Sequence, residues 1–492
     1  MTESAQHRSI YFRSLEVKNV RCFGERQILE LVNDEDRLAQ WTLLLGDNGV
    51  GKTTLLECLA WMRPVPRKAD DVSDTSKSEN ASDPSIADDA SDPVQIPLTN
   101  EENEVLKSLL RAGTETEVEL ELSATLAIGG NLGEPAHAKR DVRTSVRMRG
   151  RDGRLVSMDP QVNVDDSVSL PGGELPVFVY GATRHMGHDN LEKDHLADDS
   201  LVTRFSIPTE LYDAEEVLLD LDYLALKEGD QNARSSERLA QVKRILASIL
   251  PGVPDEKGIE ILGPKPLRPS DSQGGVTFKT PYGTVPLSGL SLGYQTMLAW
   301  ALDLAARLYR CYPESANPLA EPAVVLVDEI DLHLHPRWQR EITADLAKHF
   351  PATQFIATAH SPVMAQSSVD AKLVVLRRDG DRVTINSRPQ FVEGWRVDQI
   401  LTSDLFGVAA RSPAIERLIE ERYDLLRKGE KTPSDERRLR ELDSRLNDLP
   451  VAIRPEDDDA MKLIRQAADL IRERKIPTTD GDDNEIVEPL DT

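Results

Sequence analysis

The sequence predicts an α/β fold in which a mixed and parallel sheet surrounds one helix, with further helices inserted and added at the C-terminal end. Three apolar strands predict the sheet. The first, Trp41 to Leu45, runs into a glycine-rich loop and a helix, whereas Val324 to Val327 and Thr353 to Thr358 are each followed by polar residues. Strands that are apolar throughout are buried on both faces, which is typical of parallel sheets.

The loop after the first strand has the pattern Gly-x-x-x-x-Gly-Lys-Thr, here Gly-Asp-Asn-Gly-Val-Gly-Lys-Thr. Glycines let consecutive backbone N–H groups turn toward a phosphate chain. In such a loop, Lys52 reaches the terminal phosphates and the hydroxyl of Thr53 binds Mg²⁺. The flanking strand and helix make a chance glycine turn the weaker interpretation. The loop residues expected to bind nucleotide are Gly46, Asn48, Gly49, Gly51, Lys52, Thr53 and Thr54.

The other two strands supply the remaining groups. Asp328 and Glu329 directly follow Val327, and His360 lies two residues beyond Thr358. We expect Asp328 to hold Mg²⁺ together with Thr53, and Glu329 to polarise the attacking water. The three strand ends are therefore expected to converge on one nucleotide, with Lys52, Glu329 and His360 as catalytic residues.

The other elements follow from hydrophobic periodicity. A buried strand within 175–184 ends near Arg184, which we expect to approach the phosphates. Apolar residues at helical spacing predict helices within 210–250, after 390 and over 461–471. Alternation predicts strands over 9–24, 26–31, 115–128, 142–148, 162–168, 276–285, 372–376 and 382–386.

The chain of 492 residues is expected to have seven segments. The Asp- and Ser-rich residues 67–100 contain few large apolar side chains and are predicted to form a flexible acidic insertion. The segments are 1–66 with the phosphate loop, 67–100, the β-rich 101–200, the helical insertion 201–275, 276–395 with the later motifs, the helical partner-docking region 396–478, and the acidic disordered tail 479–492.

The charge limits the possible partners. The chain has 59 basic and 85 acidic residues, a formal charge of −26, which argues against a protein that grips nucleic acid with its whole surface. No apolar run approaches the length of a membrane span, and the N-terminal residues lack a signal-peptide hydrophobic region. We expect a cytoplasmic protein without a membrane partner.

Cysteine and histidine spacing indicates no structural metal site. Cys22, Cys58 and Cys311 are scattered and are expected to be buried thiols. Three histidines lie close together in the sequence, but without a regular ligand spacing a polar loop is the better interpretation. These histidines are His185, His188 and His195.

A second candidate phosphate site lies at 290–295, where a Leu-Ser-x-Gly-x-Gln turn opens a long apolar helix. Ser291 and the N–H groups around Gly293 are suited to bind a phosphate at the N-terminus of that helix. Because the chain already has one phosphate loop, this second site suggests a nucleotide shared between two subunits.

These motifs, in this order, resemble the Walker A, signature, Walker B with D-loop, and switch-histidine motifs of ABC-type ATPases. Residues 328–336, Asp-Glu-x-x-x-His-Leu-His-Pro, are similar to the branch that holds RecF-like, OLD-family and anti-phage defence ATPases. The signature departs from Leu-Ser-Gly-Gly-Gln at Leu292 and Tyr294, and there is no clear Q-loop glutamine.

The resemblance implies an ABC-ATPase head with ATP and Mg²⁺ as cofactors, and it implies roles for single residues. His360 would sense the γ-phosphate, Asp331 would lie at the dimer seam, and Ser291 would act on the partner's ATP. Residues 19–23 also resemble an N-terminal strand of that branch, in which Arg21 would contact phosphate.

Residues 394–407 and the charged helices after them resemble the PtuA ATPase subunits of Septu and retron systems. This resemblance implies a homodimer around ATP, a higher oligomer, and a separate PtuB-like HNH nuclease partner. Contact with nucleic acid, or with a retron reverse transcriptase and its msDNA, would occur through that complex.

Other classes fit less well. The chain has no long heptad insertion, unlike SMC-like repair ATPases, and no clustered carboxylates after His360, unlike OLD-type nucleases. A transporter nucleotide-binding subunit is also disfavoured. A RecF-like repair ATPase that acts directly on DNA remains open, and a positive channel formed by 111–151 or 377–396 would support it.

Overall fold

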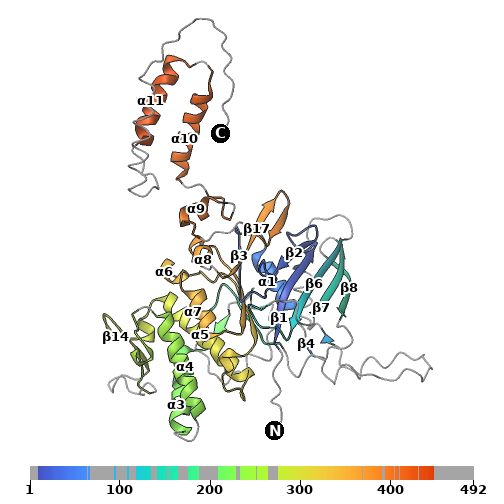
Figure 1. Ribbon diagram of the computed structural model, residues 1–492, viewed down its shortest axis with the longest axis vertical. Coiled ribbons are helices and arrows are strands. Elements are labelled where there is room, and N and C mark those ends of the chain that lie inside the picture. Colours follow the sequence, from blue (N-terminus) through green and yellow to red (C-terminus); the bar gives the residue numbers. More distant parts are fainter. Residues whose placement is uncertain are drawn as a thin grey trace, which may run out of the picture. The chain divides into compact units, whose positions relative to one another are not determined.

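A computed structural model describes a large part of the chain, which divides into two compact units, Met1–Val408 and Ala409–Thr492 (Figure 1). The described residues are 9–63, 65–66, 94–95, 108–109, 118–134, 141–151, 154–163, 175–187, 205, 209–228, 233–250, 252–263, 275–367, 370–389, 394–403, 405–408, 411–429 and 431–447.

A six-stranded sheet forms the centre of the first unit, in the order β18-β17-β3-β16-β15-β9. Its strands are β3 (Trp41–Leu45), β9 (Val177–Tyr180), β15 (Ala323–Val327), β16 (Thr353–Thr358), β17 (Lys372–Asp379) and β18 (Arg382–Asn386). All neighbours are parallel except β17 and β18, which pair antiparallel. Every residue of β3, β9, β15 and β16 is buried, as apolar parallel strands require. The C-terminal ends of β3, β15 and β16 therefore meet at one edge.

A second, antiparallel sheet has the order β2-β1-β6-β7-β8. Its strands are β1 (Ile10–Lys18), β2 (Gln27–Glu30), β6 (Val118–Ile128), β7 (Asp141–Arg151) and β8 (Arg154–Asn163). The strand predicted over 162–168 is wrong in position, because β8 pairs with β7 from Arg154 onward and so begins earlier. Residues 164–168 lie outside the described residues.

The helix after the phosphate loop, α1 (Lys52–Trp61), lies between the two sheets (Figure 1). Leu55, Leu56 and Leu59 of this helix are fully buried. They belong to one apolar core with side chains from the antiparallel sheet, such as Leu122, and from one face of the central sheet, such as Leu326. The mixed and parallel sheets around a phosphate-loop helix confirm the predicted α/β class.

The opposite face of the central sheet packs on helices in a second core. The helices are α3 (Ala214–Glu228), α4 (Ala233–Ile249), α5 (Leu292–Cys311) and α7 (Ile342–His349). Alternate residues of β15 separate the cores, since Val324 and Leu326 face α1 whereas Val325 and Val327 face the helices. The long helix predicted after the Leu-Ser-x-Gly-x-Gln turn is confirmed as α5.

The remaining elements are short. A three-stranded sheet of β12 (Ile259–Ile261), β13 (Val276–Thr280) and β14 (Gly283–Pro286) adjoins the helices, so the segment expected as a helical insertion also contains strand β12. The others are β4 (Val65–Pro66), β5 (Val94–Gln95), β10 (His185–Met186), β11 (Glu210–Leu211), α6 (Pro336–Gln339), α8 (Pro362–Ser367), α9 (Val397–Thr402) and the 3₁₀ turns Glu256–Gly258, Leu287–Gly289 and Pro318–Ala320.

The second unit contains a helical hairpin of α10 (Pro413–Arg427) and α11 (Pro433–Asn447). Arg438 of α11 pairs with Glu421 of α10 at 2.7 Å, and Arg422 pairs with Asp443 at 2.6 Å. The buried side chains of Leu425 and Leu442 provide its apolar contact. The helix predicted over 461–471, the acidic tail and nearly all of 67–100 lie outside the described residues.

Two expectations from composition can be compared with the structure. Cys58 is buried as predicted, whereas Cys22 is half-buried, and the expectation is wrong for Cys311, which is exposed. Cys311 is the last residue of α5, where the helix has passed the core. Within the described residues, no helix has the length and apolar character needed to span a bilayer.

Candidate nucleotide-binding site

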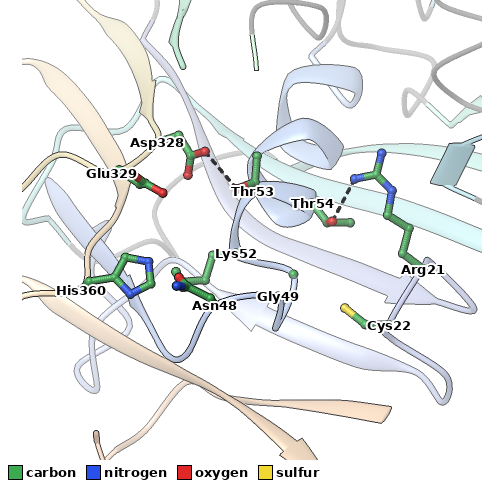
Figure 2. A pocket seen from close by; sticks show the side chains of 11 residues that line it. Arg21, Cys22, Asn48, Gly49, Lys52, Thr53, Thr54, Asp328, Glu329 and His360 are labelled. Carbon is green, nitrogen blue, oxygen red and sulfur yellow. Dashed lines mark hydrogen bonds between the residues drawn. The ribbon is translucent and has the colours of Figure 1, made fainter. Parts of the chain in front are cut away.

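The phosphate loop lies at the edge where β3, β15 and β16 end, and it encloses a cavity of about 310 Å³ (Figure 2). The loop needs glycine at two points. Gly49 and Gly51 have φ of 77° and 84°, in the left-handed region that glycine adopts without strain. A Cβ atom on Gly51 would also lie 2.5 Å from the Cys22 sulfur, so the turn between β1 and β2 packs directly on the loop. The lining residues are Arg21, Cys22, Asn48, Gly49, Gly51, Lys52, Thr53, Thr54, Asp328, Glu329 and His360.

Lys52 lines this cavity as a cation, as does Arg21. Its Nζ donates to the backbone carbonyls of Gly46 and Asp47, each at 2.8 Å. Gly46 itself does not line the cavity and contributes this carbonyl. Burial lowers the pKa of Lys52, and the nearby carboxylates of Asp328 and Glu329 oppose that shift. A buried ammonium whose hydrogen bonds within the described residues go to carbonyl oxygens is well placed to bind an anion.

Asp328 joins the three strand ends. One carboxylate oxygen accepts a hydrogen bond from Thr53 Oγ1 at 2.9 Å, and the other accepts from Thr358 Oγ1 at 2.6 Å. The sequence predicted the contact with Thr53 but missed Thr358. The available signal was a hydroxyl residue at the end of an otherwise apolar strand.

The pair of Thr53 and Asp328 fits Mg²⁺. The ion prefers oxygen ligands and is usually held by one or two protein groups together with phosphate oxygens. Here the Thr53 hydroxyl and an Asp328 carboxylate oxygen lie 2.9 Å apart, and both residues line the cavity. The described residues contain no group of three or more His, Cys, Asp or Glu side chains that could hold a metal on their own.

Glu329 lines the same cavity in a turn directly after β15. It is one of the few non-glycine residues with positive φ, at 48°. Its backbone N–H donates to Thr358 Oγ1 at 2.7 Å, and its carbonyl accepts from Arg184 Nη2 at 3.1 Å. The expectation that Arg184 approaches the phosphates is wrong, because its side chain is buried behind this turn and bonds to backbone oxygens.

His360 and Asp331 are tied to each other. The backbone N–H of His360 donates to the Asp331 carboxylate at 2.9 Å. Asp331 is not among the residues that line the cavity. Gln339 reinforces the link by donating to the Asp331 carbonyl at 3.3 Å while accepting from Ser361 Oγ at 2.6 Å. The imidazole of His360 faces the same space as Lys52 (Figure 2).

Arg21 reaches the cavity from the strand side. Its guanidinium pairs with Glu57 at 2.6 Å and donates to Thr54 Oγ1 at 3.0 Å (Figure 2). Burial raises the pKa of Glu57, and Arg21 opposes that shift. Arg21 is thus held beside the cavity by its contacts with Glu57 and Thr54 of α1.

The signature residues lie outside this cavity. Ser291 is the exposed N-cap residue of α5, and its side chain makes no capping hydrogen bond. Gly293 packs on the segment after Asp328, because a Cβ atom there would lie 2.4 Å from the His333 carbonyl oxygen. Tyr294 packs edge-to-face on Trp338, with centroids 3.9 Å apart.

The histidines predicted to belong to a polar loop are only partly described. His185 is exposed, and its ring nitrogen lies 3.4 Å from the Thr183 carbonyl oxygen. His188 and His195 lie outside the described residues.

Comparison with known protein families agrees with this geometry. A model described as "AAA domain" matches residues 14–161, and one described as "AAA domain, putative AbiEii toxin, Type IV TA system" matches residues 219–364. The first contains the phosphate loop, and the second contains the signature turn, Asp328, Glu329 and His360.

Two curated relatives share part of the sequence. The Septu protein PtuA of Bacillus mycoides (strain KBAB4) is 37% identical over 163 residues, 33% of this chain and 22% of that protein. The protein named "Retron Ec83 probable ATPase" of Escherichia coli is 38% identical over 152 residues, 30% of this chain and 27% of that protein. The chain thus spans about a quarter of the length of these relatives.

Among solved structures, the SMC head bound to the C-terminal winged-helix domain of ScpA is 17% identical with a TM-score of 0.38, covering 77% of this chain and 97% of that one. The SMC head domain from Thermotoga maritima is 13% identical with a TM-score of 0.35, covering 77% and 99%. Two stretches of the chain that contain the site residues thus match AAA domain models, and part of the chain is similar in sequence to the Septu PtuA proteins and the retron ATPases.

Proposed function

We propose that the chain binds and hydrolyses ATP with Mg²⁺ at the cavity bounded by the phosphate loop. The observation that carries this proposal is the hydrogen bond between Thr53 and Asp328, which brings the two Mg²⁺ ligands together within one cavity. Glu329 and His360 line that cavity, and the ammonium of Lys52 lies in it.

Each group has a role that its surroundings allow. The N–H groups of the loop and Lys52 bind the phosphates, and Thr53 and Asp328 would hold Mg²⁺, which would neutralise charge on the phosphate oxygens. Glu329 orients and polarises the attacking water. His360 contacts the γ-phosphate, and its backbone link to Asp331 transmits that contact to the turn after β15.

The position of the signature supports a homodimer that encloses ATP. Ser291 is exposed and outside the cavity of its own chain, at the N-terminus of a helix of 20 residues, where an anion is stabilised. We place this serine at the ATP of a second copy, with Asp331 at the seam and further copies adding to the dimer.

The relatives named as Septu and retron proteins support a role in anti-phage defence. We propose that the assembly controls a separate HNH-type, PtuB-like nuclease, and that the chain has no nuclease site of its own. The hairpin of α10 and α11 is the proposed docking region, where Tyr423 and Leu426 are 55% and 43% exposed. Contact with nucleic acid, or with a retron reverse transcriptase and its msDNA, would then occur through the complex.

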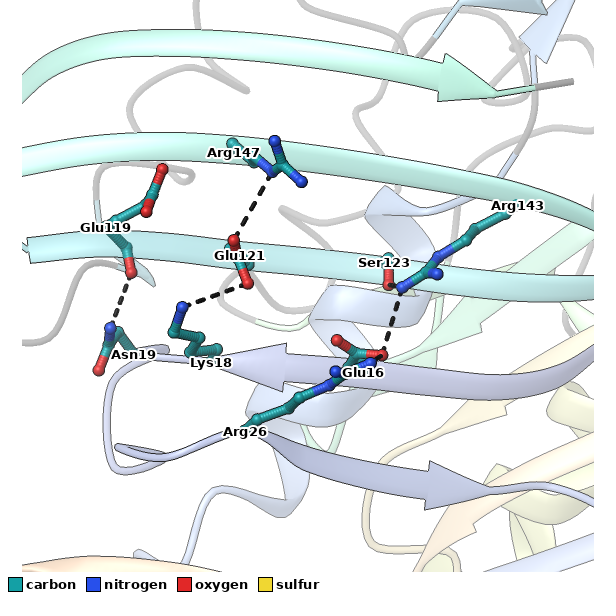
Figure 3. A network of polar contacts seen from close by, with 9 residues as sticks. All are labelled: Glu16, Lys18, Asn19, Arg26, Glu119, Glu121, Ser123, Arg143 and Arg147. Carbon is teal, nitrogen blue, oxygen red and sulfur yellow. Dashed lines mark hydrogen bonds and ion pairs between the residues drawn. The ribbon is translucent and has the colours of Figure 1, made fainter.

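The alternative, direct action on DNA by a RecF-like ATPase, has less support. The exposed cations on the antiparallel sheet lie in a network with carboxylates (Figure 3). Arg143 and Arg26 pair with Glu16 at 3.3 and 2.5 Å, and Lys18 and Arg147 pair with Glu121 at 3.3 and 3.6 Å. Cations already paired in this way are less available to phosphates.

Two arginines in the described part of the 377–396 region are paired in the same way. Arg382 pairs with Glu25, and Arg388 pairs with Glu30 at 3.3 Å. The positive channel that would favour direct DNA binding is therefore not supported by these side chains.

The test is affinity purification of the tagged full chain and its Glu329→Gln variant from the native host, with mass spectrometry and a nuclease assay on the eluate. Recovery of a small nuclease in stoichiometric amount would support the defence role. Phosphate release by the wild type but not by the Glu329→Gln variant would support ATP hydrolysis. Recovery of DNA without a protein partner would instead support the RecF-like repair ATPase. A wild type that fails to bind ATP would refute the whole proposal.

A further inference from the structure

The conformation of Glu329 requires a restraint. A non-glycine residue at positive φ is strained, and it persists only where neighbouring groups hold it. Here the strained residue follows the last residue of β15 by two positions, and its side chain lines the cavity. If the turn relaxed, the direction of the Glu329 side chain would change with it.

Hydrogen bonds hold both backbone groups of Glu329. The N–H donates to Thr358 Oγ1 at 2.7 Å. The carbonyl accepts from Arg184 Nη2 at 3.1 Å, while Nη1 of the same guanidinium donates to the Asp328 carbonyl at 2.7 Å. Arg184 therefore clamps two consecutive carbonyls of the turn, one on each side of the strained φ.

Arg184 is an unusual choice for such a position. It is 6% exposed, and its hydrogen bonds go to the carbonyls of Gly181, Asp328 and Glu329. Its Nε atom has no hydrogen-bond partner among the described residues. Burial lowers the pKa of Arg184 to about 10, so the group remains charged at neutral pH. The nearby carboxylates of Asp328, Glu329 and Asp331 partly offset the cost of burying this cation. Its hydrogen bonds nevertheless go to backbone carbonyls of the turn, which indicates a role in holding that turn.

The segment that carries Arg184 is itself anchored. Tyr180, the last residue of β9, accepts a hydrogen bond from the Asp328 N–H at 2.8 Å. Its hydroxyl donates to the buried carboxylate of Asp303 in α5 at 2.8 Å. The backbone just before Arg184 is thus fixed beside β15, and the Arg184 side chain bonds to the turn.

We propose that Arg184 is a positioning residue that holds the Glu329 turn in the strained conformation and so aims the Glu329 carboxylate at the attacking water. This inference rests on the proposed ATP hydrolysis. Lysine should replace arginine only partly, because one ammonium cannot reproduce two donors held in a rigid fork.

The test uses the full-length chain with Mg²⁺ and compares Arg184→Met and Arg184→Lys with Arg310→Met. Arg310 is an exposed arginine near the C-terminal end of α5 that donates to the Tyr212 hydroxyl at 2.8 Å. For each protein, the ATP dissociation constant, kcat and thermal midpoint are measured separately.

The expected result is a split between binding and turnover. Arg184→Met should lower kcat about 10- to 100-fold, the scale for a misplaced catalytic group, while the dissociation constant for ATP changes less than about threefold. Arg184→Lys should lie between Met and wild type, and Arg310→Met should match wild type. A merely structural arginine would affect the thermal midpoint without this order in kcat.

Four outcomes would overturn the inference. Wild-type kcat in the Met variant, or an ATP affinity that falls as far as kcat, would exclude a positioning role while leaving the proposed function intact. If the Arg184→Met variant does not fold, a wild-type kcat in the Arg184→Lys variant would also exclude the positioning role. A wild type that binds ATP without turnover would refute hydrolysis, and this inference with it.

Discussion

At the residue scale, two buried threonines of the same strand differ in what their hydroxyls do. Thr358, at the end of β16, donates to Asp328 and accepts from the N–H of Glu329. Thr353, at the start of β16, is also buried, but its hydroxyl has no hydrogen-bond partner in the described part of the chain. A comparison of the same substitution at Thr358 and at Thr353 therefore distinguishes the contribution of the hydrogen bonds to stability from the effect of replacing a buried threonine.

We predict that Thr358→Val lowers the free energy of unfolding by about 1–3 kcal/mol, since it leaves a carboxylate oxygen and an N–H without a partner. The variant should also lower kcat, because the Glu329 turn loses one of its restraints. Denaturant unfolding and phosphate release measure the two effects. The control, Thr353→Val, should be neutral or stabilising, and an equal loss in both variants would contradict the assignment.

Glu329→Gln gives the second prediction at this scale. The amide keeps the size of the side chain but cannot act as a base, so hydrolysis should fall about 10²- to 10⁴-fold. ATP binding should persist, because the phosphate loop and Lys52 are unchanged. Nucleotide binding and phosphate release on the same sample test this. Glu341→Gln, an exposed glutamate at the N-cap of α7, is the control. Unchanged turnover in Glu329→Gln would exclude the base.

At the element scale, α5 contains a buried ion pair whose carboxylate also bonds to the central sheet. Asp303 and Arg307, one helical turn apart, lie 2.5 Å from each other and are almost fully buried. Asp303 also accepts from the Tyr180 hydroxyl and from the Tyr212 N–H. The helix that begins at the signature turn is thereby fixed to β9, the strand that leads to Arg184.

We predict that Arg307→Met lowers the free energy of unfolding by about 3–5 kcal/mol, because it leaves the Asp303 carboxylate buried without its cation. Denaturant unfolding measures the change. Arg310→Met, on the same helix but exposed, should cost about 1 kcal/mol or less. A similar cost for both variants would show that burial of the ion pair does not decide its contribution.

The central strands could be predicted because each is apolar throughout and followed by a polar group with a defined chemistry. The pattern correctly predicted β3, β15 and β16. It also predicted that the phosphate loop, Asp328, Glu329 and His360 would lie around one cavity, as the structure has them. The hydrophobic period and the motif spacing are local signals, so the sequence contains them fully.

The placement of Arg184 could not be predicted in the same way. An arginine after a buried strand at this edge can point into the cavity or behind the neighbouring turn, and the sequence pattern is identical. The choice depends on the pairing of β9 with β15 and on the backbone carbonyls that this pairing exposes. The bounds of β8 failed for a related reason, since its register is set by β7.

At the scale of the whole molecule, the chain has one unit that contains the candidate nucleotide site and a second unit that contains the helical hairpin. The cavity residues all fall in Met1–Val408, whereas the hairpin of α10 and α11 belongs to Ala409–Thr492. The hairpin is held by its own ion pairs and by the buried Leu442. Catalysis and partner docking should therefore be separable by mutation.

We predict that a chain ending at Val408 binds and hydrolyses ATP like the full chain but no longer co-purifies with the nuclease. Leu442→Asp should reproduce the loss of the partner without truncation, because a buried charge disrupts the hairpin. Arg440→Gln, an exposed change on the same helix, is the control and should keep the partner. ATPase assays and affinity purification measure the two activities. If the shortened chain retained the nuclease, the docking surface would lie on the unit that contains the candidate nucleotide site, and the hairpin would need another role.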